Sequence, residues 1–292
     1  MSGTQNNSFG AGKRYPMTRD GGQVIFGDGL SYDANSRTLT ATGGGLEAGS
    51  GENSLQSGAG ANAGGASSIS IGLGSAASGT DSYAIGDNAQ ATALHSIAIG
   101  TNVIASEEKA QAFGFNAVAS GYGAMAHGYD CSATASDAIA IGGATSASGI
   151  NSLAMVNGAG LGGSGDASIA IGWLANAVGL RSIAMSVQAS ATGSHAIAIG
   201  SNSNASGTTS VAIGREAVAS GASAIAVGAG AQATATNSIA LGASTSTANT
   251  MALPFGVAGD IFICSAANVW TRLAKGTDGQ VLTMVAGVPA WA

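Results

Sequence analysis

The chain has 292 residues, of which 48 are glycine, 8% are charged and 5% are aromatic, and its formal net charge is -6. Typical domains contain about 25% charged residues, so this composition argues against an ordinary globular protein with one thick core. The few basic residues form no stripe that could follow a phosphate backbone, and we therefore expect no nucleic-acid partner.

The N-terminal region, residues 1–45, carries much of the charge and begins with a polar, Gly-rich stretch that lacks the apolar segment of a signal peptide. Short strands are predicted at residues 23–26 and 37–40, with a turn-forming sequence at 27–29. We expect this region to be an attachment arm followed by a short β region. No window approaches eighteen consecutive apolar residues, so no membrane insertion is expected.

A fourteen-residue unit is repeated fourteen times between Ser54 and Met251, within a predicted repeat domain at 46–252. Residues 96–100 read Ser-Ile-Ala-Ile-Gly, and the same frame recurs at 138–142, 168–172, 196–200 and 238–242. A repeat of this kind is a one-dimensional stack in which each unit packs on its neighbours. The sequence therefore predicts a rod.

The positions of the unit, counted from that Ser, have different physical demands. The second and fourth are large and apolar, the third is Ala in twelve of the fourteen units, and the fifth is Gly in twelve. Alternation over five residues is strand periodicity, and the Gly corners turn the chain back. Two short strands and two turns describe one coil of a flat parallel β-roll, and fourteen coils at about 4.8 Å each give a rod of roughly 65 Å.

The nearly constant third position indicates that the Ala side chains pack between the two strands of a coil. The Ile rows then form a long apolar stripe on the outside, larger than the few hundred Å² that a monomer usually exposes. If the Ile rows point inward instead, the Ala row lines a flat outer face that also suits close packing. Both arrangements predict an oligomer.

One unit is irregular, because residues 152–167 number sixteen instead of fourteen. We expect the two extra residues to form an outward loop near residues 158–165 that tolerates insertion after Gly163.

The repeat ends at Pro254, and residues 253–292 are predicted to form a small β module. Strand-like segments occur at 259–264 and 281–285, with a turn signal at 276–279.

The unit Ser-Ile-Ala-Ile-Gly-x-x-Ala-x-Ala-x-Gly resembles the head repeat of YadA-like trimeric autotransporter adhesins, over about two thirds of the chain. The resemblance implies an all-β fold: a left-handed parallel β-roll in an intertwined homotrimer, with small β end-regions. It also implies that the Ile rows meet around the threefold axis. The trimer-core residues are then Ile69, Ile71, Ile97, Ile99, Ile139, Ile141, Ile169, Ile171, Ile197 and Ile199.

The ends of the chain have a different resemblance. Segments 259–268, 272–283 and 287–291 together resemble a module common in tailed-phage fibre proteins, and 26–30 with 39–42 are similar to strand-turn-strand pieces of such fibres. This implies a structural virion protein made in the host cytoplasm: a homotrimeric tail fibre that contributes to host-cell attachment. Its N-terminal region would contact a tail or baseplate protein, and its receptor would lie on the host surface, with a glycan as one candidate. The alternatives are a fragment of a bacterial trimeric surface adhesin and a head or neck fibre of the same kind of particle.

Catalytic chemistry finds no support in the sequence, since no Ser/His/Asp or paired-carboxylate constellation stands out, and we expect neither an enzyme nor a cofactor. Cys131 and Cys264 match no metal or redox spacing. His127 takes the fourth position of its unit, where neighbouring units have Phe113 and Ile141. In a trimer, three such imidazoles could bind a metal ion or an anion near the axis. The alternative is a buried neutral imidazole bonded to backbone or water, and no other metal site is expected.

Overall fold

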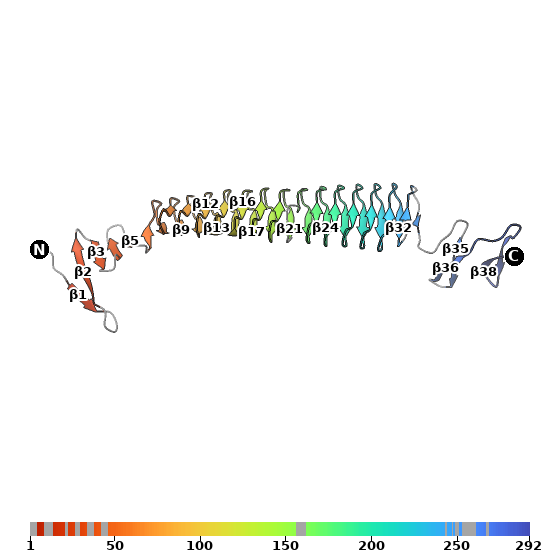
Figure 1. Cartoon of the computed structure of the whole chain (residues 1–292), viewed down its shortest axis with the longest axis horizontal. Coiled ribbons are helices and arrows are strands. Elements are labelled where there is room, and N and C mark those ends of the chain that lie inside the picture. Colours follow the sequence, from red (N-terminus) through yellow and green to blue (C-terminus); the bar gives the residue numbers. More distant parts are fainter. Residues whose placement is uncertain are drawn as a thin grey trace.

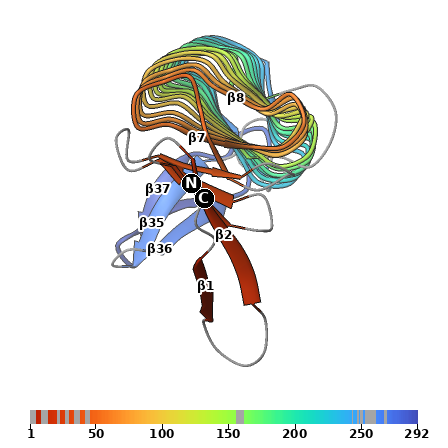
Figure 2. The same ribbon diagram turned by 90° about the vertical axis from the view of Figure 1, so that its left-hand side faces the viewer.

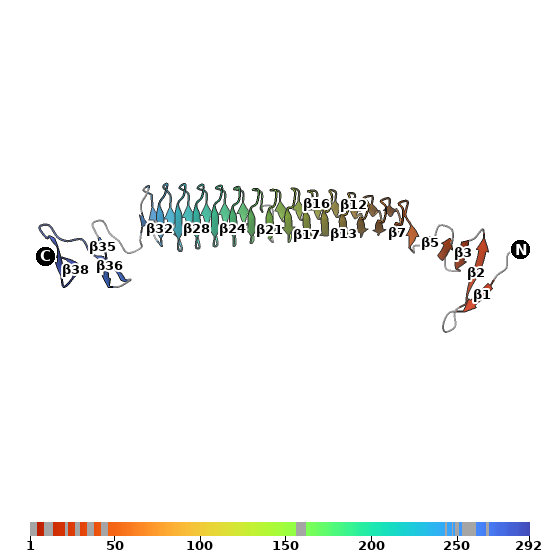
Figure 3. The same ribbon diagram turned by 180° about the vertical axis from the view of Figure 1, so that it is seen from behind.

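The computed structural model describes residues 5–8, 14–20, 23–26, 30–33, 38–41, 46–155, 162–242, 244–246, 248, 251–252, 261–266 and 269–292. Their regular structure is entirely β, which confirms the predicted fold class. The strands stack into a long rod with small β regions at its two ends (Figures 1 and 3). Within the described residues, no helix is long and apolar enough to cross a membrane.

The rod is a parallel β-solenoid in which each coil contributes one strand to each of two faces. The first sheet has sixteen strands: β6 (Glu47–Ala48), β7 (Leu55–Ser57), β9 (Ile69–Ile71), β11 (Tyr83–Ile85), β13 (Ile97–Thr101), β15 (Gln111–Phe115), β17 (Met125–Tyr129), β19 (Ile139–Ile141), β21 (Leu153–Met155), β22 (Ile169–Ile171), β24 (Ile183–Met185), β26 (Ile197–Ile199), β28 (Val211–Ile213), β30 (Ile225–Val227), β32 (Ile239–Leu241) and β34 (Met251–Ala252). All pairs in this sheet are parallel except the first, β6 with β7.

The second face consists of two-residue strands in sheets of seven and six. They are β8 (Asn62–Ala63), β10 (Ala76–Ala77), β12 (Gln90–Ala91), β14 (Ile104–Ala105), β16 (Val118–Ala119), β18 (Ser132–Ala133) and β20 (Ser146–Ala147), followed by β23 (Asn176–Ala177), β25 (Ser190–Ala191), β27 (Asn204–Ala205), β29 (Val218–Ala219), β31 (Gln232–Ala233) and β33 (Ser244–Thr245). Seen along the rod, the coils superimpose in one flattened outline (Figure 2).

The end regions contain antiparallel strands. At the N-terminal end a five-stranded sheet has the order β1 (Gln5–Ser8), β2 (Arg14–Asp20), β3 (Gln23–Phe26), β4 (Leu30–Asp33) and β5 (Thr38–Ala41). The C-terminal end has two hairpins, β35 (Ile261–Ala266) with β36 (Val269–Leu273) and β37 (Leu282–Val285) with β38 (Val288–Trp291). The predicted segments at 23–26, 37–40, 259–264 and 281–285 thus overlap observed strands.

Each coil repeats the same backbone conformation because each coil must hydrogen-bond the next. The amide of Ile97 donates to the carbonyl of Ala110 at 2.9 Å, and the amide of Asn102 donates to the carbonyl of Asp87 at 2.8 Å, so strands and corners are both paired. At the fifth position Gly100 has a φ of 134°, and a Cβ added there would lie 1.8 Å from the carbonyl oxygen of Gly114. Glycine is therefore required at this corner both by φ and by the close approach of the next coil.

Among the described fifth positions one departs from this rule, because Ser186 stands there with a φ of 110°. A side chain in such a conformation costs about 1–3 kcal/mol. We expect Ser186→Gly to stabilise the folded protein by about 1 kcal/mol, after subtraction of the extra backbone entropy of an unfolded glycine. Ser201→Gly is the matched control, because Ser201 stands at the sixth position of the following coil and has no positive φ. It should give no gain in chemical denaturation, and equal effects of the two substitutions would contradict the strain assignment.

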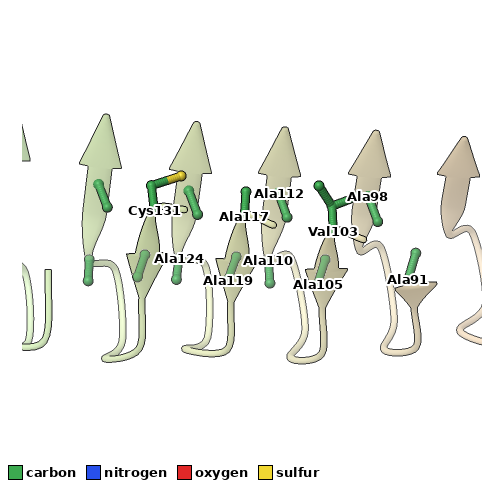
Figure 4. Close-up of a cluster of buried hydrophobic side chains, with 14 of the residues drawn as sticks. Ala91, Ala98, Val103, Ala105, Ala110, Ala112, Ala117, Ala119, Ala124 and Cys131 are labelled. Atoms are coloured by element: carbon green, nitrogen blue, oxygen red, sulfur yellow. The ribbon is translucent and has the colours of Figure 1, made fainter. Parts of the chain in front are cut away.

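The interior of the roll is a thin layer of small side chains. Third-position residues such as Ala98 and tenth-position residues such as Ala105 are fully buried, and they face each other between the two strands of a coil (Figure 4). The eighth position adds Val103 and Cys131 among the largest buried side chains. The prediction that Ala packs inside and Ile outside is confirmed, and the alternative arrangement is wrong because the inter-strand space admits only small groups.

The buried thiol of Cys131 is a natural reporter of unfolding. Burial raises the pKa of Cys131 from 9.0 to about 11, and the thiolate is the reactive form. In a Cys264→Ser background at pH 8, we expect maleimide to label Cys131 only after denaturation. Rapid labelling of the folded chain would show that the roll opens locally around this coil.

The same pKa difference predicts a pH dependence of stability. Since the folded pKa of Cys131 exceeds its unfolded value, its contribution to stability is complete below about pH 9 and is lost as the pH rises through about 11. We expect the free energy of unfolding to fall more steeply over this window than in a Cys131→Ala variant, which has the residue found at the same position of the preceding coil, Ala117. Parallel pH profiles of the two proteins would contradict this prediction.

The expectation for the irregular unit is partly wrong. Gly163 is buried and bridges Ala147 and Ala177, and its carbonyl accepts the amide of Ser148 at 3.0 Å. It thus takes the place of a tenth-position Ala and continues the second face, so an insertion after it would interrupt the ladder. The register places the two additional residues between Met155 and Gly162, and residues 156–161 lie outside the described residues.

Candidate interaction surface

The outer side of the first sheet presents two rows of side chains along the rod, from the second and fourth positions of each coil. We call the surface that these rows form between Ile69 and Leu241 the apolar face. All but two of its side chains are apolar or aromatic, and it carries no Asp, Glu, Lys or Arg. The strands alternate so that the third-position residue points into the roll while the second and fourth point out.

The apolar face is incompletely covered in the single chain. Second-position side chains are half-buried except for the exposed Tyr83, whereas many at the fourth position are exposed, with 37% exposure at Ile99 and Ile199 and 39% at Ile213. About thirteen coils at roughly 4.8 Å each make this surface roughly 60 Å long. Contiguous apolar surface of that extent indicates an interface rather than a solvated face.

The second face is largely polar, whereas the corners carry charged residues together with exposed apolar side chains such as Leu73 and Trp173. Outward positions of the second face hold mainly Ser, Thr, Asn and Gln, and the apolar exceptions are Ala76, Ile104, Val118, Val178 and Val218. The charged residues of the coils lie at the corners, where His95 Nε2 is 3.5 Å from Asp81 Oδ2 and Arg215 pairs with Glu216 at 2.8 Å. Within the described part of the roll, the apolar face is the side whose rows stay apolar on nearly every coil, so it is the side on which another apolar surface could pack along the whole roll.

Gln111 and His127 are the two polar side chains of the apolar face, and they lie on adjacent strands, β15 and β17. In the paired register His127 is next to Phe113, with ring centroids 5.7 Å apart, and Gln111 is next to Met125. No hydrogen bond from either side chain is found within the described part of the chain.

The same coils carry an aromatic stack that the sequence reasoning missed. Phe115 and Tyr129, at the sixth position, lie nearly parallel at an interplanar angle of 6° and a centroid distance of 5.4 Å. Pairing in β13, β15 and β17 extends over five residues and includes this position. The sequence does contain a signal for this stack, because two aromatic residues occupy the same position of successive units, fourteen residues apart.

The predicted trimer-core residues all lie on the apolar face. They occupy the outward positions of β9, β13, β19, β22 and β26. Their role between chains stays a prediction. His127 is exposed in the single chain. The alternative of a buried imidazole bonded to the backbone therefore does not hold within one chain. No group of three His, Cys, Asp or Glu side chains suited to a metal ion is found among the described residues of one chain, and ion binding by His127 stays a prediction.

A second apolar surface, which the sequence reasoning did not single out, lies on the C-terminal hairpin. Val281 and Met284 are 64% and 65% exposed, and Val285 is also exposed. On the same hairpin the indole of Trp291 donates to the carbonyl of Ala274 at 2.6 Å, and its ring packs against Gly276. The apolar surface of this end module, like the apolar face, is left open in the single chain.

Comparison with known proteins identifies a repeat family. The family model described as the YadA head domain repeat matches residues 77–102, 105–130, 133–155, 164–185, 191–217 and 219–245, just over half of the chain. Among solved structures, the chain is similar to the crystal structure of the collagen-binding domain of Yersinia adhesin YadA. The identity is 24%, the match covers 64% of this chain and 76% of that one, and the TM-score is 0.30. No curated protein matches the chain.

Proposed function

The chain belongs to the family of proteins built from YadA head domain repeats, and from this premise we propose that it forms a homotrimeric adhesin-type fibre on the tail of a bacteriophage. The apolar face is the observation that carries the trimer. Three copies that turn this face toward a common axis would remove their exposed Ile rows from water. The polar second face and the charged corners would remain in solvent.

Folding energetics support the same assembly. Fixing a backbone residue costs about 1–2 kcal/mol, and a fourteen-residue coil whose interior is mainly Ala buries little apolar surface of its own. At about 25 cal/mol per Å², the remaining stabilisation must come largely from the side chains of the apolar face. We therefore expect folding and trimerisation to be coupled.

The virion location is supported by the two ends of the chain. Segments 259–268, 272–283 and 287–291 resemble a module common in phage fibres, and 26–30 with 39–42 resemble strand-turn-strand pieces of such fibres. In this proposal the N-terminal region binds a tail or baseplate protein, and the rod holds the C-terminal module away from the particle. Repeated weak contacts with the host surface then gain strength from multivalency.

A bacterial surface adhesin is the second candidate, since the head repeat itself fits it equally well. Immunogold labelling of the culture that produces the protein distinguishes a phage fibre from a bacterial adhesin. The antibody is raised against the full recombinant chain. We expect label on the tails of particles purified by density gradient, and antibody treatment should reduce adsorption of those particles to cells. Label confined to the bacterial surface, with none on particles, would favour the adhesin and contradict the virion location.

The attachment role of the N-terminal region has its own test. Deletion of residues 1–20 should leave the repeat region folded but prevent incorporation into particles, as measured by immunoblot of purified virions. Unchanged incorporation would show that attachment lies elsewhere in the chain.

A further inference from the structure

A homotrimer of near-identical coils has an assembly problem that follows from its regularity. If one chain slips along the rod by one coil, about 4.8 Å, each second- and fourth-position side chain meets the equivalent side chain of the neighbouring unit. Ile again faces Ile over most of the length, and only one coil at each end loses its partners. Apolar burial along the roll therefore discriminates poorly between the aligned trimer and slipped ones.

The apolar face contains one interruption that breaks this equivalence. Gln111 at a second position and His127 at a fourth position stand on adjacent strands, with apolar or aromatic side chains at the same positions from Ile69 to Ile99 and from Ile139 to Leu241. We call these two residues the polar layer. We propose that the polar layer fixes the axial register in which the three chains assemble, an inference that rests on the proposed trimer.

The physical basis is hydrogen-bond satisfaction. A neutral imidazole and a carboxamide each donate and accept hydrogen bonds, and within the described chain neither Gln111 nor His127 uses its side chain for one. In the aligned trimer, the Gln111 and His127 side chains of all three chains share neighbouring levels and can bond one another. In a slipped trimer they face apolar side chains such as Ile97 and Ile141, and each unpaired buried group costs about 1–3 kcal/mol. A buried polar residue sets register in coiled coils by the same mechanism.

The shape of the same coils supports this reading. Phe113 adjoins His127, and Phe115 stacks on Tyr129, so two successive strands carry rings at both the fourth and the sixth positions. The bulk of these rings fits a partner chain that presents the same two coils at the same level. A slipped partner would present Ile and smaller residues there, which would leave poorly packed space.

The test is whether chains with and without the polar layer assemble together. A layer-free variant contains Gln111→Ile and His127→Ile, so no register of a mixed trimer can bring the polar layers of three chains together. Wild-type and variant chains of the full sequence, with tags of different mass, are mixed in denaturant, refolded and counted by native mass spectrometry. Random mixing of equal amounts gives four kinds of trimer in the ratio 1:3:3:1, of which the two middle kinds are mixed trimers. We expect the mixed trimers to be depleted at least about tenfold, since one unpaired buried group at about 1.4 kcal/mol already gives that factor.

Two controls keep the result interpretable. Wild-type chains carrying the two different tags should mix at random. The layer-free variant should form trimers on its own, because Ile occupies both positions as it does in other coils. Random mixing of this variant with wild type would overturn the register role while leaving the proposed trimer intact. A monomeric wild-type chain would refute the trimer and this inference together.

Discussion

Replacing Ile169 and Ile171 with aspartate should abolish assembly of the protein. Both side chains lie on the apolar face, on the outer side of β22, and the third-position Ala170 between them is fully buried. In the proposed trimer, the two substitutions put six carboxylates at one level of a buried apolar interface. Uncompensated buried charge costs several kcal/mol per ion, so we expect aggregated or unfolded chain in sedimentation velocity.

The matched control lies in the same coil on the opposite surface. Asn176→Asp with Val178→Asp adds the same number of carboxylates to the polar second face, where Val178 is 46% exposed. This variant should assemble like the wild type. A soluble and folded Ile169→Asp, Ile171→Asp monomer would show that the apolar face does not need another chain.

Substitution of a fifth-position glycine should be the most costly single change within a coil. For Gly100→Ala, the new Cβ would meet the carbonyl oxygen of Gly114 at 1.8 Å, at a φ of 134° that an L-residue rarely adopts. Gly100 is paired with Gly114 in the ladder between β13 and β15, so relaxation would break this ladder. We expect a loss of more than about 3 kcal/mol in the free energy of unfolding, measured by chemical denaturation at fixed chain concentration.

Gly230 provides the control because its φ of 68° is also positive but no atom lies within 4 Å of an added Cβ. Asn202 and Glu216 adopt φ values of 57° and 59° at the equivalent position of the two preceding coils. We therefore expect Gly230→Asn to change stability by no more than about 0.5 kcal/mol. Equal costs at Gly100 and Gly230 would show that the fifth position is not limited by the approach of the next coil.

The repeat made the fold of the roll predictable, and the reason is visible in single positions. The third-position Ala98 could be assigned to the interior because it hardly varies between units, and the outward direction of Ile97 and Ile99 followed from strand alternation. The thin interior explains why a unit with so little Leu or Phe can still form a continuous core. The fixed unit length predicted the parallel register of the regular coils without knowledge of any contact, whereas the last coil pairs Ile239 with Met251, twelve residues apart.

Local departures from the repeat were harder to predict. Gly163 reads as part of a flexible Gly-rich stretch, yet it is a buried member of the second face, because sequence spacing alone does not locate an insertion within its coil. The stack of Phe115 on Tyr129 depends on the strand extension beyond the usual corner, which no single unit reveals. Likewise, Gln111 gains significance only from its position beside His127 on a face that is otherwise apolar.

The central claim, that the apolar face is covered by two further copies of the chain, is tested most directly by sedimentation equilibrium of the full-length protein. At micromolar concentration we expect a single species with three times the chain mass of 27.7 kDa, and it should dissociate only when the β structure unfolds. A folded species of one chain mass that persists over the same concentrations would contradict the account.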